Sequence, residues 1–381
     1  MSGDTKLSIS CLCGTAKQAV ELRNTESGPL DIDICHSYDS RYSSGLLYVS
    51  YAPIRVPSSL DGLVEYPDES AQSSADTLRR YFCGTCGCHV FRRSAVDDGK
   101  DSTSWEVATG TIIGRVGADE VEVNGKEPLL RYARHINTDD TKDGGLSPFI
   151  NIGEETRSTK RDQININTSR NAEDVLKAHC HCKAVSFQIT RPDTSSRLLR
   201  SNFPDLTHPY ATTPQEIVPN PHDEKWWLRP RGKDDPDLTR YLAGTCACRS
   251  CRLSSGFEIQ TWAFVPRSNI FFLPPSSPTP IPLDFSMLQR PPSPLRSYES
   301  TPGVLREFCP RCGASVFWHD RWRPELIDVS VGLLAAEEGA RAESWLDWWK
   351  GRVSFEEDVG NGRSGVLTGE YVFSYDISSS W

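Results

Sequence analysis

Three cysteines in the segment GTCACRSCRLSSG, residues 244–256, have the spacing of a metal-binding knuckle. Cys246, Cys248 and Cys251 form the pattern C-x-C-x-x-C. Zn²⁺ prefers four thiolate or imidazole ligands in a tetrahedron, and short turns between cysteines direct several sulfurs to one ion. Three protein ligands with a fourth position open are the pattern of a catalytic zinc site. The segment therefore predicts a zinc centre that can accept a group from a substrate.

The chemistry of such a centre follows from its charge. Zinc with three thiolates carries a formal charge of −1, so it is a weak Lewis acid toward water. It can still accept a substrate thiol and lower the pKa of that thiol, which makes a thiolate nucleophile. Arg249 and Arg252 flank the knuckle, and we expect them to offset negative charge or to bind a substrate carboxylate. Two alternatives remain open: the arginines are exposed to solvent, or a nearby histidine completes a structural site.

Eight further cysteines fall into two matching sets. The pairs CLC and CHC are followed much later by RYFCGTCGCHVF (80–91) and REFCPRCGASVFW (306–318). Each set supplies four thiols, and a closed four-sulfur zinc site is the structural kind that contributes directly to folding. The expected ligands are Cys11, Cys13, Cys83 and Cys86 in one set, and Cys180, Cys182, Cys309 and Cys312 in the other.

The knuckle also has an earlier counterpart, which has lost two thiols. The segment DICHSYDSRYSSG, residues 33–45, aligns with it without a gap. Cys35 matches Cys246, but Ser37 and Ser40 stand where the later segment has cysteine. A serine hydroxyl does not deprotonate near neutral pH as a zinc-bound cysteine does. We therefore expect three zinc ions per chain, one in the earlier part and two in the later part.

These repeats predict two tandem β domains, residues 6–150 and 175–378, joined by a polar linker at 151–174. A chain of 381 residues is long enough for two cores. β-Branched and aromatic residues predict strands at 46–54, 184–189, 256–265 and 369–377, and one helix is expected at 335–349. The later part is longer at 183–245 and 274–294, where we expect surface loops. The expected fold class is mainly β with few short helices.

Composition narrows the possible partners and location. The formal charge of −9 gives no electrostatic case for nucleic acid or an anionic membrane. No apolar run approaches the roughly 18 residues of a membrane span, and the first residues lack the apolar core of a signal peptide. Thirteen cysteines at close spacings suggest metal sites in a reducing compartment rather than disulfides. We expect a cytoplasmic protein; its oligomeric state is not predicted.

The order of these motifs resembles the glutathione-dependent formaldehyde-activating family, which includes a vertebrate centromere protein (centromere protein V). The resemblance implies tent-like antiparallel sheets with two zinc ions per domain: a structural ion on Cys180, Cys182, Cys309 and Cys312, and a catalytic ion on Cys246, Cys248 and Cys251. In the earlier domain it implies the structural ion alone, on Cys11, Cys13, Cys83 and Cys86.

The activity implied by the resemblance is condensation of formaldehyde with glutathione to S-hydroxymethylglutathione, classed as a carbon–sulfur lyase reaction. The partner is then a small molecule, glutathione or a glutathione adduct. We expect the second domain to be active and the first to be a scaffold. The alternative is a non-enzymatic, zinc-stabilised binding module.

Overall fold

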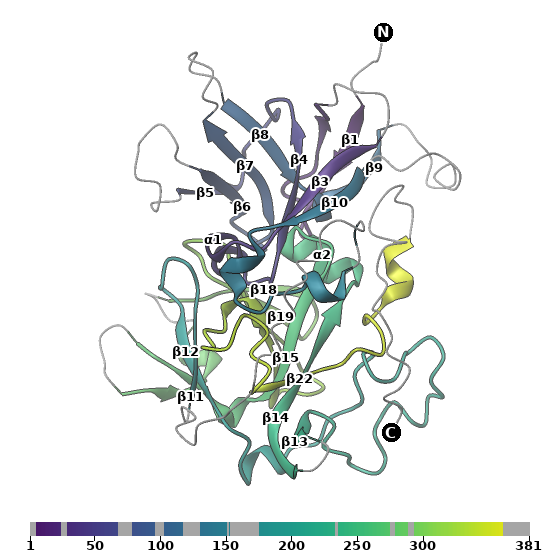
Figure 1. Ribbon diagram of the computed structural model, residues 1–381, viewed down its shortest axis with the longest axis vertical. Coiled ribbons are helices and arrows are strands. Elements are labelled where there is room, and N and C mark those ends of the chain that lie inside the picture. The colour runs from purple at the N-terminus through teal and green to yellow at the C-terminus, as the bar shows by residue number, and fades with distance from the viewer. Residues whose placement is uncertain are drawn as a thin grey trace.

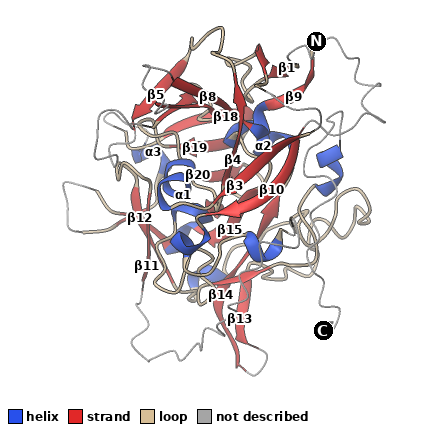
Figure 2. Ribbon diagram, turned by 45° about the horizontal axis from the view of Figure 1, so that its top comes forward, coloured by secondary structure: helices blue, strands red, loops and turns tan. Residues whose placement is uncertain are grey.

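The computed structural model describes residues 5–23, 29–67, 78–95, 103–116, 130–150, 152, 175–232, 235–274, 279–288 and 293–360. The chain is mainly β with few short helices (Figure 2), which confirms the expected fold class. The expected strand at 369–377 and all of the linker except Ile152 lie outside the described residues. None of the described helices has the length and apolar character needed to cross a membrane.

Residues 6–150, here called the first half, form two sheets. A three-stranded sheet has the order β2-β1-β9, and a seven-stranded sheet has the order β10-β3-β4-β8-β7-β6-β5. The strands are β1 (Lys6–Ile9), β2 (Gln18–Glu21), β3 (Leu30–Cys35), β4 (Val49–Ile54), β5 (Leu63–Pro67), β6 (Arg79–Cys83), β7 (His89–Ala95), β8 (Thr103–Ala108), β9 (Ile112–Arg115) and β10 (Leu130–Ile136).

Residues 175–360, the described part of the second half, repeat this plan. A four-stranded sheet has the order β11-β12-β16-β17, and an eight-stranded sheet runs β13-β14-β15-β21-β20-β19-β18 with β22 beside β14. The strands are β11 (Val175–His179), β12 (Ser186–Thr190), β13 (Leu228–Gly232), β14 (Asp235–Cys246), β15 (Gln260–Pro266), β16 (Ile270–Phe272), β17 (Ile281–Pro282), β18 (Arg296–Thr301), β19 (Val304–Phe308), β20 (Ser315–Asp320), β21 (Leu326–Ser330) and β22 (Leu346–Trp348).

The large sheets of the two halves correspond strand by strand. From β3 outward the order is β4-β8-β7-β6-β5, and from β14 outward it is β15-β21-β20-β19-β18. These ladders are antiparallel, but β3 and β14 each also have one parallel neighbour, β10 and β22 respectively. The parallel pairs were not expected from the sequence. Each parallel pair places a late segment of its half beside the strand that ends at a cysteine. That cysteine is Cys35 in the first half and Cys246 in the second.

Helices are short and connect strands. The α-helices are α1 (Tyr38–Ser44), α2 (Arg249–Ser255) and α3 (Phe285–Leu288). Single 3₁₀ turns follow strands or close loops: η1 (Thr109–Thr111), η3 (Thr138–Thr141), η4 (Ser147–Phe149), η5 (Ser195–Arg197), η6 (Arg267–Asn269), η7 (Val331–Leu333) and η8 (Glu356–Gly360). In Figure 1, α1 and α2 both lie at the junction between the two halves.

The helix expected at 335–349 is absent; that prediction was wrong. The segment forms turns followed by β22. Gly339 has φ of 148° and Ala342 has φ of 50°, and both values are incompatible with a helix. The Ala340 amide donates to the Thr141 carbonyl over 3.0 Å, and the Arg341 guanidinium donates to the Gly145 carbonyl over 2.8 Å. Contacts with the first half therefore override the helical propensity of this stretch.

The longer segment at 183–245 is not merely a surface loop. It contains β12, β13 and all of β14 except its last residue, and its Trp227 is fully buried. The indole nitrogen of Trp227 donates to the Ser196 carbonyl over 3.1 Å, so a turn of the same segment satisfies this buried polar group. The proline-rich segment at 274–294, described only in part, contains the two-residue edge strand β17 and the four-residue helix α3.

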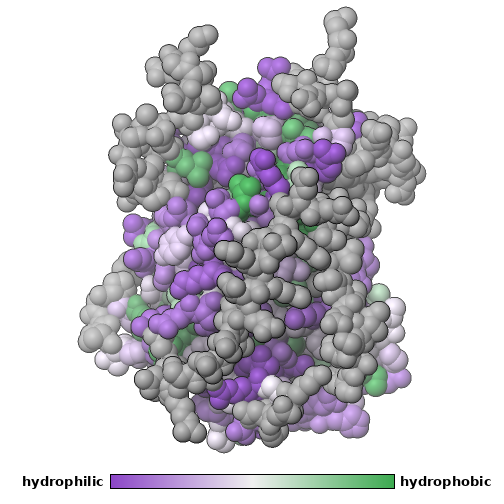
Figure 3. Space-filling model, viewed as in Figure 1, coloured by the Kyte–Doolittle hydropathy of each residue, from purple (hydrophilic) through white to green (hydrophobic). Residues whose placement is uncertain are grey.

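The core is shared between the halves. One continuous cluster of buried apolar side chains includes Phe91 of the first half and Phe317 of the second. On the face seen in Figure 3, the described surface is largely hydrophilic, with separate small hydrophobic spots. Scattered apolar residues of this kind are normal for a folded surface. The main apolar burial therefore lies inside and between the two halves.

Candidate metal centres

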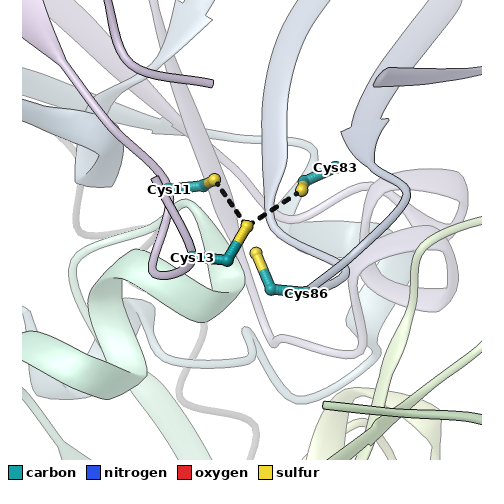
Figure 4. Close-up of side chains that lie close together, drawn as sticks. All are labelled: Cys11, Cys13, Cys83 and Cys86. Carbon is teal, nitrogen blue, oxygen red and sulfur yellow. Dashed lines mark hydrogen bonds between the residues drawn. The ribbon is translucent and has the colours of Figure 1, made fainter. Parts of the chain in front are cut away.

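Four cysteines from two segments of the first half meet at one point (Figure 4). The sulfur of Cys13 lies 3.4 Å from that of Cys11 and 3.5 Å from that of Cys83, and with Cys86 all four sulfurs lie within 4.8 Å of one another. A tetrahedron of sulfurs about 2.3 Å from a central ion has edges of about 3.8 Å. A disulfide would need about 2.05 Å. The four thiols are therefore placed to hold one zinc ion.

The second half has the same arrangement. The sulfur of Cys182 lies 3.5 Å from those of Cys180 and Cys309, and Cys312 completes a group within 4.8 Å. Backbone amides support both sites in the same way: Ala16 donates to the Cys11 sulfur and Val185 to the Cys180 sulfur, each over 3.4 Å. Such bonds favour the thiolate that zinc requires. Both four-cysteine groups fit a closed structural site.

The knuckle sulfurs of Cys246, Cys248 and Cys251 also lie within 4.8 Å of one another. β14 ends at Cys246, and Cys248 is the N-cap of α2, where its sulfur accepts a hydrogen bond from the Cys251 amide over 3.3 Å. A cysteine thus fills the capping role usually taken by serine or aspartate. Among the residues that the structure describes, no histidine or carboxylate joins the three sulfurs, so the expected alternative of a completing histidine finds no support.

The three sulfurs of the knuckle need a cation nearby if all three are to be ionised. The neighbouring thiols of Cys248 and Cys251, together with burial, raise the pKa of Cys246 well above its usual range. Three thiolates this close together, two of them buried, repel one another, so they cannot all ionise without a positive charge between or beside them. A divalent ion supplies that charge at the centre. The donor set of three sulfurs, with a fourth position open, suits zinc better than magnesium or calcium.

A second positive charge comes from Arg306, which the sequence reasoning missed. Arg306 is buried on β19, and its guanidinium nitrogens lie 3.7 and 3.8 Å from the sulfur of Cys251. The same guanidinium donates to the Ser250 hydroxyl over 3.0 Å. The signal was in the sequence, because RYFC and REFC share this arginine. Arg306 therefore provides the counter-charge that we expected from Arg249 and Arg252.

Those two arginines lie elsewhere. Arg249 is exposed, and in the part of the chain that the structure describes its backbone amide lies 3.5 Å from an Asp358 carboxylate oxygen. Arg252 is buried, and its guanidinium donates to the carbonyl groups of Gly110 and, over 3.1 Å, Ile112. The expectation that Arg252 binds a substrate carboxylate is therefore not supported: the side chain is directed into the first half and bonds main-chain oxygens there.

Aromatic side chains cover the knuckle. Trp262, Trp318 and Phe355 pack against its cysteines. Phe355 is held by the longer segment at 183–245, because the Asp205 carboxylate accepts from the Phe355 amide over 2.7 Å and the ring of Tyr210 meets that of Phe355 edge-on at 5.9 Å. These contacts show what the longer segment does: it fixes a hydrophobic wall beside the metal ligands.

The counterpart in the first half has the same backbone but keeps only one of the three thiols. β3 ends at Cys35, and Ser37 caps α1 by accepting from the Ser40 amide over 3.3 Å. The capping residues have nearly identical angles, φ −57° and ψ 151° at Ser37 against φ −59° and ψ 149° at Cys248. The Cys35 sulfur accepts a hydrogen bond from the Asn137 amide over 3.3 Å. The Cys35 sulfur is therefore surrounded by hydrogen-bonding groups where the knuckle has partner thiols.

A cavity of about 290 Å³ lies beside Cys35. Its charged walls are already paired: Arg92 contacts Glu106 over 2.6 and 2.8 Å, and Arg134 contacts Asp33 over 2.7 Å. The lining residues are Asp31, Asp33, Cys35, Val49, Tyr51, Pro53, Arg92, Glu106, Ala133, Arg134 and Ile136. Because Arg92 and Arg134 already pair with carboxylates of the protein, their charges are less available to bind a charged substrate.

Cys88 and His181 lie close in sequence to the cysteine clusters but belong to none of them. Cys88 is fully buried, as expected for a packed thiol. His181 lies between Cys180 and Cys182 in the sequence, but its ring nitrogens contact the Tyr66 hydroxyl over 2.6 Å and the Asp39 carboxylate over 3.1 Å. The histidine thus links the second half to two residues of the first half.

The fold and the three clusters define a mainly β protein whose cysteines are grouped to hold metal ions. Residues 6–120 match the family model described as glutathione-dependent formaldehyde-activating enzyme. The matched range lies in the first half, with its four-cysteine group and with Cys35, Ser37 and Ser40 at the counterpart of the knuckle. None of the curated proteins matches the chain. The first half is thus similar to a family of glutathione-related zinc enzymes.

Proposed function

We propose that this protein is a zinc-dependent enzyme of the carbon–sulfur lyase type that acts on a glutathione adduct at the knuckle of its second half. The observation that supports this most directly is the group of three clustered sulfurs, with no fourth ligand among the described residues and a buried arginine beside it. A purely structural site would be closed by a fourth ligand. The family match of the first half supports glutathione as the thiol.

Each group at the site has a distinct role. Cys246, Cys248 and Cys251 hold the ion, and a zinc ion there supplies an acceptor for a thiolate. Arg306 stabilises the negative charge of the three sulfurs, because a buried guanidinium close to a thiolate attracts it strongly at low dielectric. Trp262, Trp318 and Phe355 exclude water from the same volume, which strengthens these electrostatic interactions.

The reaction that fits these groups is the addition of a thiol to a carbonyl. The glutathione sulfur forms a bond to the carbon of formaldehyde, the carbonyl π bond breaks toward oxygen, and the thiol proton ends on that oxygen. The product is S-hydroxymethylglutathione, and no oxidant or reductant is needed. A different small aldehyde, or another glutathione adduct, fits the same residues.

We propose three zinc ions per chain: one on each four-cysteine group and one on the knuckle. In this proposal the first half is a scaffold, since Ser37 and Ser40 replace two of its thiols and its cavity charges are paired. The same features favour the alternative of a non-enzymatic binding module for the first half. All thirteen cysteines are free, which supports a reducing, cytoplasmic location.

Calorimetry on the full chain tests the thiolate proposal. Glutathione is expected to bind at least about tenfold more tightly than S-methylglutathione, whose sulfur cannot ionise; a tenfold difference corresponds to about 1.4 kcal/mol. The matched control is the double variant Cys248→Ser, Cys251→Ser, in which the two peptides are expected to bind equally. Equal affinity for both peptides in the unaltered protein would show that the sulfur plays no part in binding.

A further inference from the structure

The two short α-helices each pack on the opposite half of the chain. α1 of the first half contacts η7 of the second, and α2 of the second half contacts η1 of the first. Figure 1 shows the green helix α2 beside the purple and blue strands of the first half. Since α2 carries Cys248 at its cap and Cys251 in its first turn, the first half lies against the segment that presents two knuckle ligands.

Arg252 is one of the residues that make this contact. It directly follows Cys251, is buried, and donates to the Gly110 and Ile112 carbonyls of the first half. The Gly110 amide in turn donates to the Gly256 carbonyl at the end of α2, over 2.9 Å. These bonds fix the rotation and position of the helix relative to the first half.

The metal loop of the first half makes a second contact with α2. Leu12 lies between the ligands Cys11 and Cys13, and its amide donates to the Leu253 carbonyl over 2.9 Å. The last carbonyls of a helix have no partner within it, so this bond satisfies one of them. In Figure 4, a pale green helix of the second half runs beside the loop that carries Cys11 and Cys13.

We infer that the first half positions the knuckle of the second half: Arg252 and the zinc loop around Leu12 hold α2 in the orientation that brings Cys248 and Cys251 to the sulfur of Cys246. Retention of metal at the knuckle therefore depends on Arg252 and on the four-cysteine site of the first half. This inference rests on the proposal that the knuckle holds a metal ion.

The physical reason is the shortness of α2. A helix of seven residues is marginal on its own and takes its stability and orientation from tertiary packing. A ligand set is effective only when its sulfurs are held near their final geometry before the ion binds. Groups outside the ligands that hold them in place typically contribute 10- to 100-fold to metal affinity.

Arg41 offers a matched control within the same chain. It occupies the position of Arg252 in α1, is buried, and donates to the Gly332 carbonyl over 3.3 Å and the Leu334 carbonyl over 2.9 Å. Replacing either arginine removes the same kind of contact between the halves. α1, however, carries Ser37 and Ser40 rather than metal ligands, so a loss at Arg41 has no knuckle ion to affect.

The experiment counts zinc in full-length Arg252→Met and Arg41→Met proteins after gel filtration with a competing chelator. We expect Arg252→Met to lose the knuckle ion and keep two, with release about 10- to 100-fold faster, while Arg41→Met keeps three. Arg252→Lys, a milder change that retains the charge and one donor nitrogen, should lie between them. Equal zinc retention by Arg252→Met and Arg41→Met would overturn the role of Arg252.

A second measurement isolates the loop around Leu12. The double variant Cys13→Ser, Cys86→Ser removes the zinc of the first half, and we expect the count to fall from three to one because the knuckle then releases its ion to the chelator. A count of two, with release at the unaltered rate, would overturn this link. An unaltered protein with only two zinc ions would instead contradict the proposed function, so the two failures are distinguishable.

Discussion

The side-chain amide of Asn137 donates a hydrogen bond to the sulfur of Cys35 over 3.3 Å. In the second half the corresponding place beside Cys246 is taken by Phe355. Both residues have left-handed backbones, φ 56° and 55°, and each precedes a 3₁₀ turn. Each follows a residue that pairs in parallel with the strand-ending cysteine. The same backbone arrangement thus surrounds polar side chains in the first half. In the second half it surrounds the three thiols and the aromatic side chains that pack against them.

This shared frame predicts that a metal site can be restored in the first half. Ser37→Cys with Ser40→Cys is expected to raise the zinc count from three to four, because the capping angles at Ser37 match those at Cys248. Elemental analysis of the purified, reduced protein measures the count. The control variant Ser58→Cys with Ser59→Cys adds two thiols at a surface turn and should leave the count at three. A double variant at 37 and 40 that holds three would show that the frame is insufficient.

The reverse change in the second half should remove one ion. Cys248→Ser with Cys251→Ser copies the pattern of the first half, and we expect the count to fall from three to two while circular dichroism shows an intact fold. The fold survives because both four-cysteine groups remain. Loss of the β spectrum in this variant would mean that the knuckle is itself needed for folding.

Arg306 should control how firmly the knuckle holds its ion. Arg306→Met removes the counter-charge 3.7 Å from the Cys251 sulfur, and we expect zinc release to a chelator roughly 10- to 100-fold faster. Arg306→Lys keeps the charge and should retain most of the affinity. Arg80→Met is the matched control, since Arg80 occupies the same place in the first half and is equally buried. Faster release from Arg80→Met as well would indicate a general loss of stability.

Substitutions at two glycines distinguish the cost of backbone strain from the cost of disturbing the contact between the halves. Gly256 has φ of +91°, and a Cβ there would lie 2.1 Å from the His89 carbonyl oxygen; Gly14 has φ of +84° with nothing within 4 Å. Gly14→Ala should cost about 1–2 kcal/mol from the left-handed backbone alone. Gly256→Ala should cost several kcal/mol more, or prevent folding. Similar midpoints in denaturant for the two variants would show that the halves separate easily at this point.

Acidification should destabilise the protein through His89. Burial, and then Arg80, lower the pKa of His89 to about 4, whereas an unfolded histidine titrates near 6.5. Between these values the unfolded chain binds the extra proton, so the free energy of unfolding falls as pH drops, by up to about 1.4 kcal/mol per unit. His89→Gln should flatten the curve of stability against pH by that slope. His222→Gln, a change at an exposed position, is the control for replacing a histidine by glutamine as such, and the same change of slope in that variant would contradict the role of His89.

Much of the candidate site could be predicted from the sequence because it is repeated. Comparing the halves separates the four-cysteine groups from the knuckle, and the structure places those sulfurs together. The role of Arg252 needed a different comparison. Arg41 stands in the same place although its neighbours Ser37 and Ser40 are not metal ligands. The shared arginine alone does not show which role it has, because Arg80 and Arg306 are also shared between the halves. The hydrogen bonds of Arg41 and Arg252 to main-chain oxygens of the opposite half show that these two make a structural contact.

Other features could not be predicted because they depend on partners distant in the sequence. Alternation and β-branched residues locate β4, β12 and β15, but the parallel strand β22 lies in a stretch of good helix formers. Local propensity is a weak signal there, since buried Trp345 and Trp348 and the bonds of Arg341 to the first half decide the backbone. The aromatic wall beside the knuckle could not be predicted from the sequence either, because Asp205 and Phe355 are 150 residues apart.

The contacts between the halves are reciprocal, as in a two-fold symmetric dimer. Arg41 bonds Leu334 as Arg252 bonds Ile112, and His181 bonds Tyr42 as Leu12 bonds Leu253. Such self-complementary surfaces allow two identical units to associate. Two unlike halves made as separate chains would also pair like with like, giving some dimers with two knuckles and some with none. Joining them in one polypeptide makes pairing intramolecular, so every molecule combines one knuckle of three thiols with one counterpart in which serines replace two of them.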